Sequence, residues 1–228
     1  MFARHSPLVT RHLGLIVAKK TKLPVVRGSI FVISAPSGTG KSTLIRRLMA
    51  DTPGLCFSIS YTTREPRATE KHGQDYYFVS RTVFERMVRH DEFVEWAEVY
   101  GHLYGTASKP LQAAMEKGQD ILLDIDVQGH QQVREKLPDA VSVFILPPSF
   151  PELARRLRDR HSDAPESIEC RLQTAREEIA HWPEYDYLVV NDELTDAALA
   201  LKAIVRAARF RRPNQARRVE KIIGTFGG

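Results

Sequence analysis

The sequence has few cysteines, no long apolar run and no internal repeat. Its two cysteines, Cys56 and Cys170, stand far apart and show neither CxxC nor His-paired spacing, so we expect no structural metal site and no disulfide framework. No apolar stretch approaches the roughly 18 residues that a membrane-spanning helix needs. These absences predict a cytoplasmic protein that does not span a membrane.

The two ends of the chain have few acidic residues. Residues 1–28 contain six Lys/Arg and no acid, and residues 206–221 contain seven Lys/Arg and one Glu. Each segment carries a net charge of +6, so the rest of the chain is left at −7 against a total of +5. A nucleic-acid-binding domain places its basic residues on a folded face. We therefore expect no specific nucleic-acid partner.

The basic N-terminal segment resembles a mitochondrial presequence in composition. Its serine content is low, and Pro7 and Pro24 limit a continuous amphipathic helix. We expect a flexible extension at residues 1–28. Whether the basic C-terminal region mediates self-association or is merely solvated stays open, so a homo-oligomer is one possibility.

With 228 residues and a hydrophobic fraction of 43%, the chain can bury a sizeable core. Short, nearly continuous apolar runs alternate with helical patterns, which is typical of a parallel sheet covered on both faces. The fold class expected is therefore α/β. The predicted strands cover residues 29–35, 56–60, 76–79, 93–99, 120–126, 141–146 and 187–190. The predicted helices cover residues 42–50, 82–89, 108–117, 128–136, 151–160, 166–181 and 195–211.

The most informative segment lies at residues 30–43, where a buried strand runs into Gly38 and Gly40 and then into a helix. Such a turn directs successive backbone N–H groups inward, and the helix adds its positive end, so the segment suits binding of a triphosphate. Lys41 adds a cation for the terminal phosphates, and the Ser42 hydroxyl is a candidate Mg²⁺ ligand. The pattern G-x-x-x-x-G-K-[ST] has Ala35 in place of its first glycine. The alternative is a tight turn that binds nothing.

A second cluster follows at residues 60–78 and contains Arg64, Arg67 and Tyr76. Arginine pairs bidentately with phosphate oxygens, and a tyrosine hydroxyl donates to the same kind of group. Placed after a P-loop, this cluster suits a second phosphorylated substrate. The alternative is a solvated surface loop.

Carboxylates stand at two further places. Glu95 is able to accept hydrogen bonds from two adjacent donors of guanine that adenine lacks, although an isolated Glu is more often a surface acid. Asp124 and Asp126 end an apolar strand, and strand alternation places both on one face. Either of them can orient a substrate or hold a Mg²⁺-bound water, or one of them can cap the following turn.

A group of arginines lies on the helical pair near residues 151–181. Arg156 and Arg160 are four residues apart and share a helix face, whereas Arg160 and Arg171 flank Pro165. A movable arginine-bearing segment suits phosphoryl transfer, which needs neutralised charge and exclusion of water.

Taken together, these segments resemble the guanylate kinases, the P-loop nucleoside-monophosphate kinases that act on GMP. The resemblance covers about residues 29–211. It rests on the order of the segments at 34–42, 62–67, 104–106, 124–129, 144–149 and 185–192. It implies a P-loop core (29–60 and 113–211), an inserted mixed α+β GMP-binding lobe (61–112), a short helical lid (155–172) and a C-terminal tail (212–228).

The resemblance also implies roles for particular residues. It places ATP at Ala35, Pro36, Ser37, Gly38, Thr39, Gly40, Lys41, Ser42, Thr43 and Asn191. It places GMP at Ser60, Arg64, Arg67, Tyr76, Glu95, Tyr104, Thr106, Asp124 and Asp126. Catalytic roles fall to Lys41, Arg67, Arg160, Arg171 and Asp124. Asp159 and His161 stand beside Arg160 where glycines are usual, which predicts a stiffer lid.

The function expected is ATP-dependent phosphorylation of GMP, with Mg²⁺ bound together with ATP. Because the acceptor is already an oxyanion, positioning and charge stabilisation suffice without a general base. One alternative is a non-catalytic interaction module of the same fold, which is expected to lack the phosphate-binding residues present here. Another is a related kinase for a different phosphorylated acceptor, such as a ribose bisphosphate.

Overall fold

The computed structural model describes residues 28–99, 101–159 and 165–226. Its centre is a five-stranded sheet in the order β2-β7-β1-β8-β9, in which every neighbouring pair is parallel. The strands are β1 (Ile30–Ser34), β2 (Leu55–Phe57), β7 (Asp120–Asp124), β8 (Val141–Leu146) and β9 (Tyr187–Val190). This arrangement confirms the predicted α/β class.

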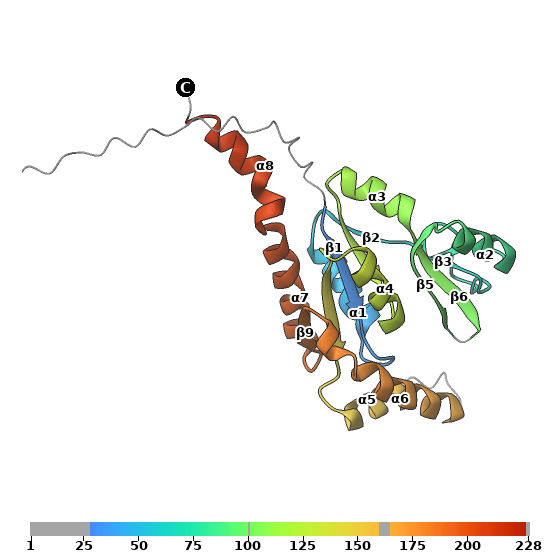
Figure 1. The fold of residues 1–228 in the computed structure, drawn as a ribbon. Coiled ribbons are helices and arrows are strands. Elements are labelled where there is room, and N and C mark those ends of the chain that lie inside the picture. Colours follow the sequence, from blue (N-terminus) through green and yellow to red (C-terminus); the bar gives the residue numbers. More distant parts are fainter. Residues whose placement is uncertain (1–27, 100, 160–164, 227–228) are drawn as a thin grey trace, which may run out of the picture.

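Helices cover both faces of this sheet, as Figure 1 shows. Phe31 and Ile33 of β1 pack toward α1 (Lys41–Asp51) and α7 (Leu194–Arg209). Ile30 and Val32 pack on the other face, with α3 (Ser108–Glu116) and α4 (Val127–Lys136). Burial on both faces explains why β1 is apolar at every position except its last.

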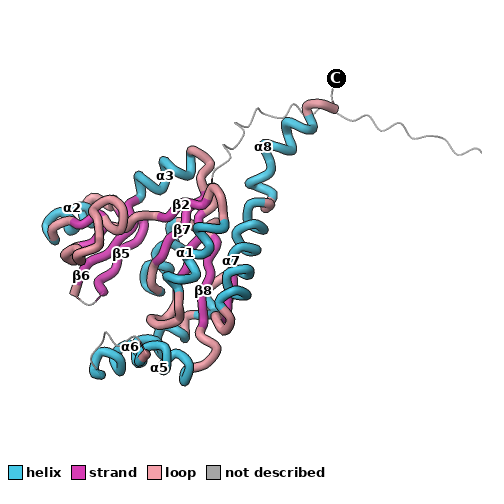
Figure 2. The backbone as a smooth tube through the Cα atoms, turned by 180° about the vertical axis from the view of Figure 1, so that it is seen from behind, coloured by secondary structure: helices cyan, strands magenta, loops and turns pink. Residues whose placement is uncertain are grey.

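A second sheet of four strands lies beside the first, in the order β4-β3-β6-β5 (Figure 2). Its strands are β3 (Tyr61–Thr62), β4 (Tyr77–Phe78), β5 (Phe93–Val99) and β6 (His102–Ala107), and α2 (Arg81–Arg89) packs on it. The sequence predicted β4, β5 and α2 but neither β3 nor β6. β3 has only two residues, and β6 carries His102 and Gly105, so neither has a strong strand pattern of its own.

The helical pair α5 (Phe150–Arg158) and α6 (Pro165–Ile179) follows β8. The two helices pack through Leu153 and Leu157 on α5 and through Leu172 and Ala175 on α6. A short 3₁₀ helix, η1 (Trp182–Glu184), which the sequence did not predict, then leads into β9.

The chain continues past α7 into α8 (Arg212–Ile223), inside the segment expected as a C-terminal tail. In Figure 1 this helix extends away from the sheets, and its apolar side chains Val219, Ile222 and Ile223 are exposed. The N-terminal extension expected at residues 1–28 lies outside the described residues except for Gly28. No described helix combines the length and apolarity that crossing a membrane requires.

Candidate functional site

The P-loop joins β1 to α1 at the carboxyl edge of the central sheet. Gly38 and Gly40 have φ angles of 91° and 95°, which lie in the left-handed region that favours glycine. The carbonyl oxygen of Pro36 accepts hydrogen bonds from the backbone N–H of Thr39 at 3.2 Å and from its hydroxyl at 2.7 Å. These contacts fix the turn that leads into α1.

Ala35 occupies the position where the phosphate-binding pattern has its first glycine. Its side chain is buried and packs in the same cluster as Leu44 and Ile145. Among the described residues, Asp91 alone is a non-glycine with positive φ, so Ala35 has ordinary backbone geometry. Glycine is therefore not needed here for its conformational freedom, and the methyl group fills core space.

Lys41 and Asp124 form an ion pair at the mouth of the P-loop. The Lys41 ammonium lies 2.6 Å from Asp124 Oδ1, and both side chains remain partly exposed. The same ammonium lies 3.4 Å from the carbonyl oxygen of Ile125. The charge predicted to contact the terminal phosphates is thus held at the edge of the sheet.

Asp126 differs from Asp124, and the prediction that the two share one strand face was wrong. β7 ends at Asp124, and Asp126 is the N-cap of α4, where its carboxylate accepts a hydrogen bond of 2.8 Å from the Gly129 N–H. The alternative that one of the pair caps the following turn is confirmed for Asp126.

A cavity of about 360 Å³ opens beside the P-loop. Asn191 lies on its wall and donates from Nδ2 to the Thr39 carbonyl oxygen at 2.6 Å. Arg156 donates to the carbonyl oxygen of Asn191 at 3.0 Å. Arg156, which the sequence singled out only as one of several arginines, thus ties α5 to the end of β9 beside the P-loop. The contact of Asn191 with adenine, which the resemblance implied, stays a prediction.

The second sheet gathers Arg64, Glu70, Tyr76 and Tyr104 into what we call the acceptor cluster. The Arg64 guanidinium lies 2.8 and 2.9 Å from the two oxygens of Glu70. It also lies 5.5 Å from the centre of the Tyr76 ring, whose centre is 5.9 Å from that of Tyr104. The pKa of Glu70 is held below its ordinary value, first by Arg64 and then by the backbone N–H of Arg67.

Arg67 lies between β3 and β4, as Arg64 and Glu70 do, but its side chain is exposed. Its N–H donates to Glu70 at 2.8 Å. Ser60 is half-buried just before β3, and its carbonyl oxygen accepts a 2.9 Å hydrogen bond from the Tyr77 N–H. The structure therefore brings Arg64, Tyr76 and Tyr104 together. It shows no contact of the Arg67 or Ser60 side chain with these three, all of which it describes.

Glu95 lies on β5, and its side of the sheet faces α4. It is only 4% exposed, and burial raises the pKa of its carboxyl to about 7, with Thr106 and Lys136 opposing the shift. A Cβ on Gly129 would lie 2.7 Å from Glu95 Oε2, so α4 approaches this carboxyl closely. The Thr106 hydroxyl beside it is buried and lowers the pKa of Glu95, although it does not meet the geometry of a hydrogen bond with any described residue. The Glu95 carboxyl therefore keeps acceptor capacity for a ligand.

The acceptor cluster and the P-loop are near neighbours. Burial raises the pKa of Tyr76, and the charges of Tyr104 and Asp124 raise it further. Asp124 is the ion-pair partner of Lys41, so this one carboxylate acts on both the P-loop and the acceptor cluster.

Gln132, which the sequence did not predict as important, fastens the lobe to α4. Its side chain donates to the Trp96 carbonyl oxygen at 2.7 Å and accepts from the Trp96 N–H at 3.1 Å.

Of the two predicted lid arginines, Arg160 and Arg171, the structure describes only Arg171. Arg160 and His161 lie outside the described residues, and Arg171 is half-buried on α6. Asp159 accepts a 2.8 Å hydrogen bond from Arg155, which ties it to the end of α5.

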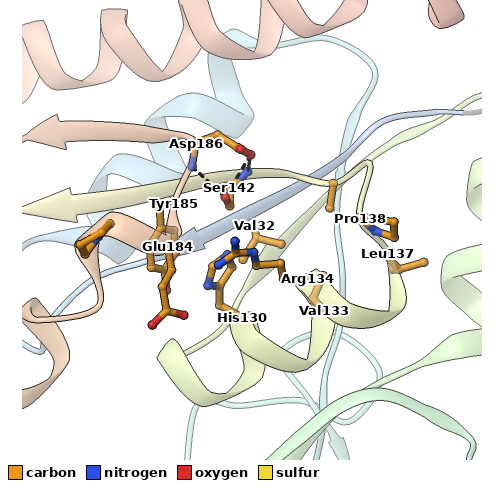
Figure 3. A pocket seen from close by; sticks show the side chains of 12 residues that line it. Val32, His130, Val133, Arg134, Leu137, Pro138, Ser142, Glu184, Tyr185 and Asp186 are labelled. Atoms are coloured by element: carbon orange, nitrogen blue, oxygen red, sulfur yellow. Dashed lines mark hydrogen bonds between the residues drawn. The ribbon is translucent and has the colours of Figure 1, made fainter.

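A separate cavity of about 200 Å³ lies beneath α4, away from these residues (Figure 3). His130 forms part of its wall and stacks on Tyr185 with ring centres 3.8 Å apart. Its carboxylates are already hydrogen-bonded, Asp186 to Ser142 and Glu184 to His181. Among the described residues, this cavity is lined by none that the sequence predicted for binding ATP or GMP or for catalysis.

Comparison with known proteins places the chain among nucleotide kinases. The family model described as guanylate kinase matches residues 27–208. The chain is 54% identical over 188 residues to the guanylate kinase of Koribacter versatilis, covering 81% of each chain. It is 46% identical over 201 residues to that of Escherichia coli strain K12, covering 87% of this chain and 97% of the relative.

The fold agrees with the sequence comparison. The crystal structure of guanylate kinase from Anaplasma phagocytophilum superposes with a TM-score of 0.70 at 37% identity. The match covers 85% of this chain and 93% of that one.

Proposed function

Since the chain belongs to the guanylate kinase family, we propose that it transfers the γ-phosphoryl group of ATP to GMP and releases ADP and GDP. One observation carries the proposal. The ion pair of Lys41 with Asp124, at the mouth of the P-loop, adjoins a cluster of Arg64 and two tyrosines suited to a second phosphate.

The donor side is built by the P-loop. We assign the triphosphate to the backbone N–H groups of residues 37–43 and to the Lys41 ammonium, which would exchange part of its contact with Asp124 for phosphate oxygens. Asn191 and the neighbouring cavity are assigned to the adenine end of ATP.

A magnesium ion fits beside the start of α1. Ser42 is exposed there and offers a hydroxyl oxygen, the hard ligand type that Mg²⁺ prefers. Triphosphate oxygens and water would complete the coordination, and the ion would neutralise charge on the phosphates when bound.

The acceptor side is built by the lobe. Arg64, Arg67, Tyr76 and Tyr104 are assigned to the phosphate of GMP. Glu95, with Ser60 and Thr106, is assigned to guanine, whose N1–H and exocyclic amine are donors that adenine does not present together. Asp124 is assigned to orienting the acceptor, and Asp126 acts through the start of α4.

The chemistry follows from this placement. The attacking atom is a phosphate oxygen that already carries charge, so the chain needs to align donor and acceptor and to stabilise spreading charge. Lys41, Arg67 and the predicted lid residues Arg160 and Arg171 are assigned to that task.

A coupled assay of ADP release tests the proposal. With ATP and Mg²⁺ we expect rapid turnover with GMP and at least 100-fold lower kcat/KM with AMP, because AMP leaves the Glu95 carboxylate without its partners. Absence of ADP release with every acceptor would indicate an interaction module, and preference for a ribose phosphate would indicate the other kinase class. Cytoplasmic location, oligomeric state and the lack of nucleic-acid and membrane partners stay predictions.

A further inference from the structure

Gly129 lies in the first turn of α4, where the local backbone does not require a glycine. Glycine is one of the least favourable residues in a helix. Among the described residues, the glycines with positive φ do not include Gly129, so its backbone would accept another residue. Gly129 is buried, and its N–H donates to Asp126 Oδ1 at 2.8 Å, which holds its backbone in place. The reason for a glycine therefore lies in the space around its Cα atom.

That space is occupied by the carboxyl group of Glu95. A Cβ at position 129 would lie 2.7 Å from Glu95 Oε2 and 3.3 Å from Glu95 Cδ. It would also lie 3.3 Å from the Cβ of Ile125, a contact that a shift of a few tenths of an ångström relieves. Glu95 Oε2 would have to recede further, by about 0.7 Å, before the 2.7 Å separation reached the 3.4 Å of an ordinary contact. A side chain at position 129 therefore competes with the Glu95 carboxyl for the same place.

The strand that carries Glu95 is fixed to α4 on either side of this residue. Gln132 donates to the Trp96 carbonyl oxygen at 2.7 Å and accepts from the Trp96 N–H at 3.1 Å. Before Glu95 on the same strand, the carbonyl oxygen of Phe93 accepts a 2.9 Å hydrogen bond from the Lys136 ammonium. Because β5 is held to α4 at both points, a methyl group at position 129 would displace the Glu95 side chain rather than the strand.

Displacement of Glu95 matters because its carboxyl is the group assigned to guanine. An acceptor that serves two adjacent donors has to lie in line with both, and hydrogen bonds weaken as distance and angle depart from their optimum. We propose that Gly129 is a specificity-determining residue, which leaves room for the Glu95 carboxyl at the place where it recognises guanine. The inference rests on the proposed function and adds to it the residue that sets the position of the guanine acceptor.

Gly129→Ala tests the proposal, because it adds one methyl group and favours the helix. We expect KM for GMP to rise about tenfold, while kcat and KM for ATP stay within about twofold of the parent and the melting temperature within about 4 °C. A general disturbance of the site would instead lower kcat and raise both KM values. Gly224→Ala is the matched control, because Gly224 has a φ of −57° and a Cβ there would lie 3.5 Å from its nearest neighbours. It should leave all three kinetic constants unchanged.

A double-mutant cycle with Glu95→Ala isolates the cause of the loss. In the Glu95→Ala background no carboxyl is left to displace, so adding Gly129→Ala should change kcat/KM for GMP less than about twofold, against about tenfold in the parent. The value of kcat/KM is taken from the linear range at low GMP concentration, so that a high KM does not prevent the measurement. Equal falls in the two backgrounds, or no fall in the parent, would overturn the proposal.

The melting temperature gives a second measurement. If Gly129→Ala melts more than about 5 °C below the parent, the double variant is compared with Glu95→Ala alone. Equal melting temperatures of these two place the collision at Glu95 and support the proposal, whereas a lower value for the double variant places it at Ile125 and overturns the proposal. The parent enzyme separates the two proposals, because a parent that does not phosphorylate GMP refutes the function, whereas an additive cycle in an active parent refutes only the role of Gly129.

Discussion

The P-loop and the acceptor cluster are the two sites proposed to bind anions, and they hold their positive groups in different ways. The P-loop uses the backbone of a turn whose flanking residues Ser34 and Thr39 are fully buried in the central layer. The acceptor cluster uses side chains, of which Tyr104 lies on β6 and the others lie between β3 and β4. Arg64 is held in place by the carboxylate of Glu70.

This difference predicts different sensitivities. A backbone site survives most substitutions, because its donors belong to the main chain and only its lysine and glycines are specific. A side-chain site loses a donor with each substitution and leaves the partner carboxylate uncompensated. The two sites should therefore separate in their effects on kcat and on KM.

Lys41→Ala should have the largest effect. It removes the cation of the donor site while sparing the backbone donors, so we expect kcat to fall about 1,000-fold or more with the melting temperature within a few degrees of the parent. Steady-state kinetics and circular dichroism measure both. Lys109→Ala, at an exposed lysine on α3, is the control. Unchanged turnover in Lys41→Ala would contradict the donor assignment.

Arg64→Ala should come next and act on the acceptor alone. It removes the planar donor and leaves Glu70 facing the GMP phosphate, so KM for GMP should rise about 100-fold while KM for ATP stays within twofold. The Arg64→Ala/Glu70→Ala double variant should recover part of this loss. An equal rise of both KM values would show that the two sites are not separable in this way.

The pH dependence of Glu95 sharpens the comparison. Only the ionised carboxylate accepts both guanine donors, and its pKa is about 7, so KM for GMP should rise about tenfold from pH 8 to pH 6. Glu95→Gln should lack this change in KM. GMP itself titrates equally in both experiments, so its effect cancels in the ratio of the KM of Glu95→Gln to the KM of the parent. A parallel pH profile in both proteins would contradict the assignment.

The same shift has the opposite sign for stability. The folded carboxyl binds its proton at a higher pH than the ordinary value of 4.5, so between about pH 7 and 4.5 protonation favours the folded state. The contribution of Glu95 to the free energy of unfolding should thus increase as GMP binding weakens. Urea unfolding of the parent and of Glu95→Gln at pH 8 and pH 6 measures it.

The smallest effect is expected at the junction of the lobe with α4. Gln132→Ala removes two hydrogen bonds to the Trp96 backbone, so the free energy of unfolding should fall by about 1 kcal/mol. Gln128→Ala, one turn earlier on α4, should stay within about 0.5 kcal/mol of the parent. Equal losses in the two variants would show that the junction does not depend on Gln132.

Local patterns were enough for the central layer. β8 and β9 were predicted with their observed ends. β8 is buried along nearly its whole length and is therefore mostly apolar. β9 is an edge strand in which only Val189 is buried, and its β-branched and aromatic residues favoured a strand. The P-loop was equally evident, since glycines, lysine and hydroxyls follow one another along the chain. The second sheet was harder, because β3 and β6 owe their strand form to each other and to β5.

Several contacts between distant residues were not predictable. The sequence reads the same whether Asp126 continues the strand of Asp124 or caps the helix that follows. Only the observed end of β7 at Asp124 separates the roles of the two carboxylates. Arg156 and Gln132 lie on ordinary helical patterns. What each one touches depends on how its helix packs.

The sequence by itself determined the layer order, the phosphate-binding turn and the identity of the charged groups, because these depend on neighbours along the chain. Tertiary structure alone decided which carboxylate faces Lys41 and which glutamate holds Arg64. Those outcomes depend on packing between elements far apart in sequence, where one residue of register or one turn of helix changes the partner.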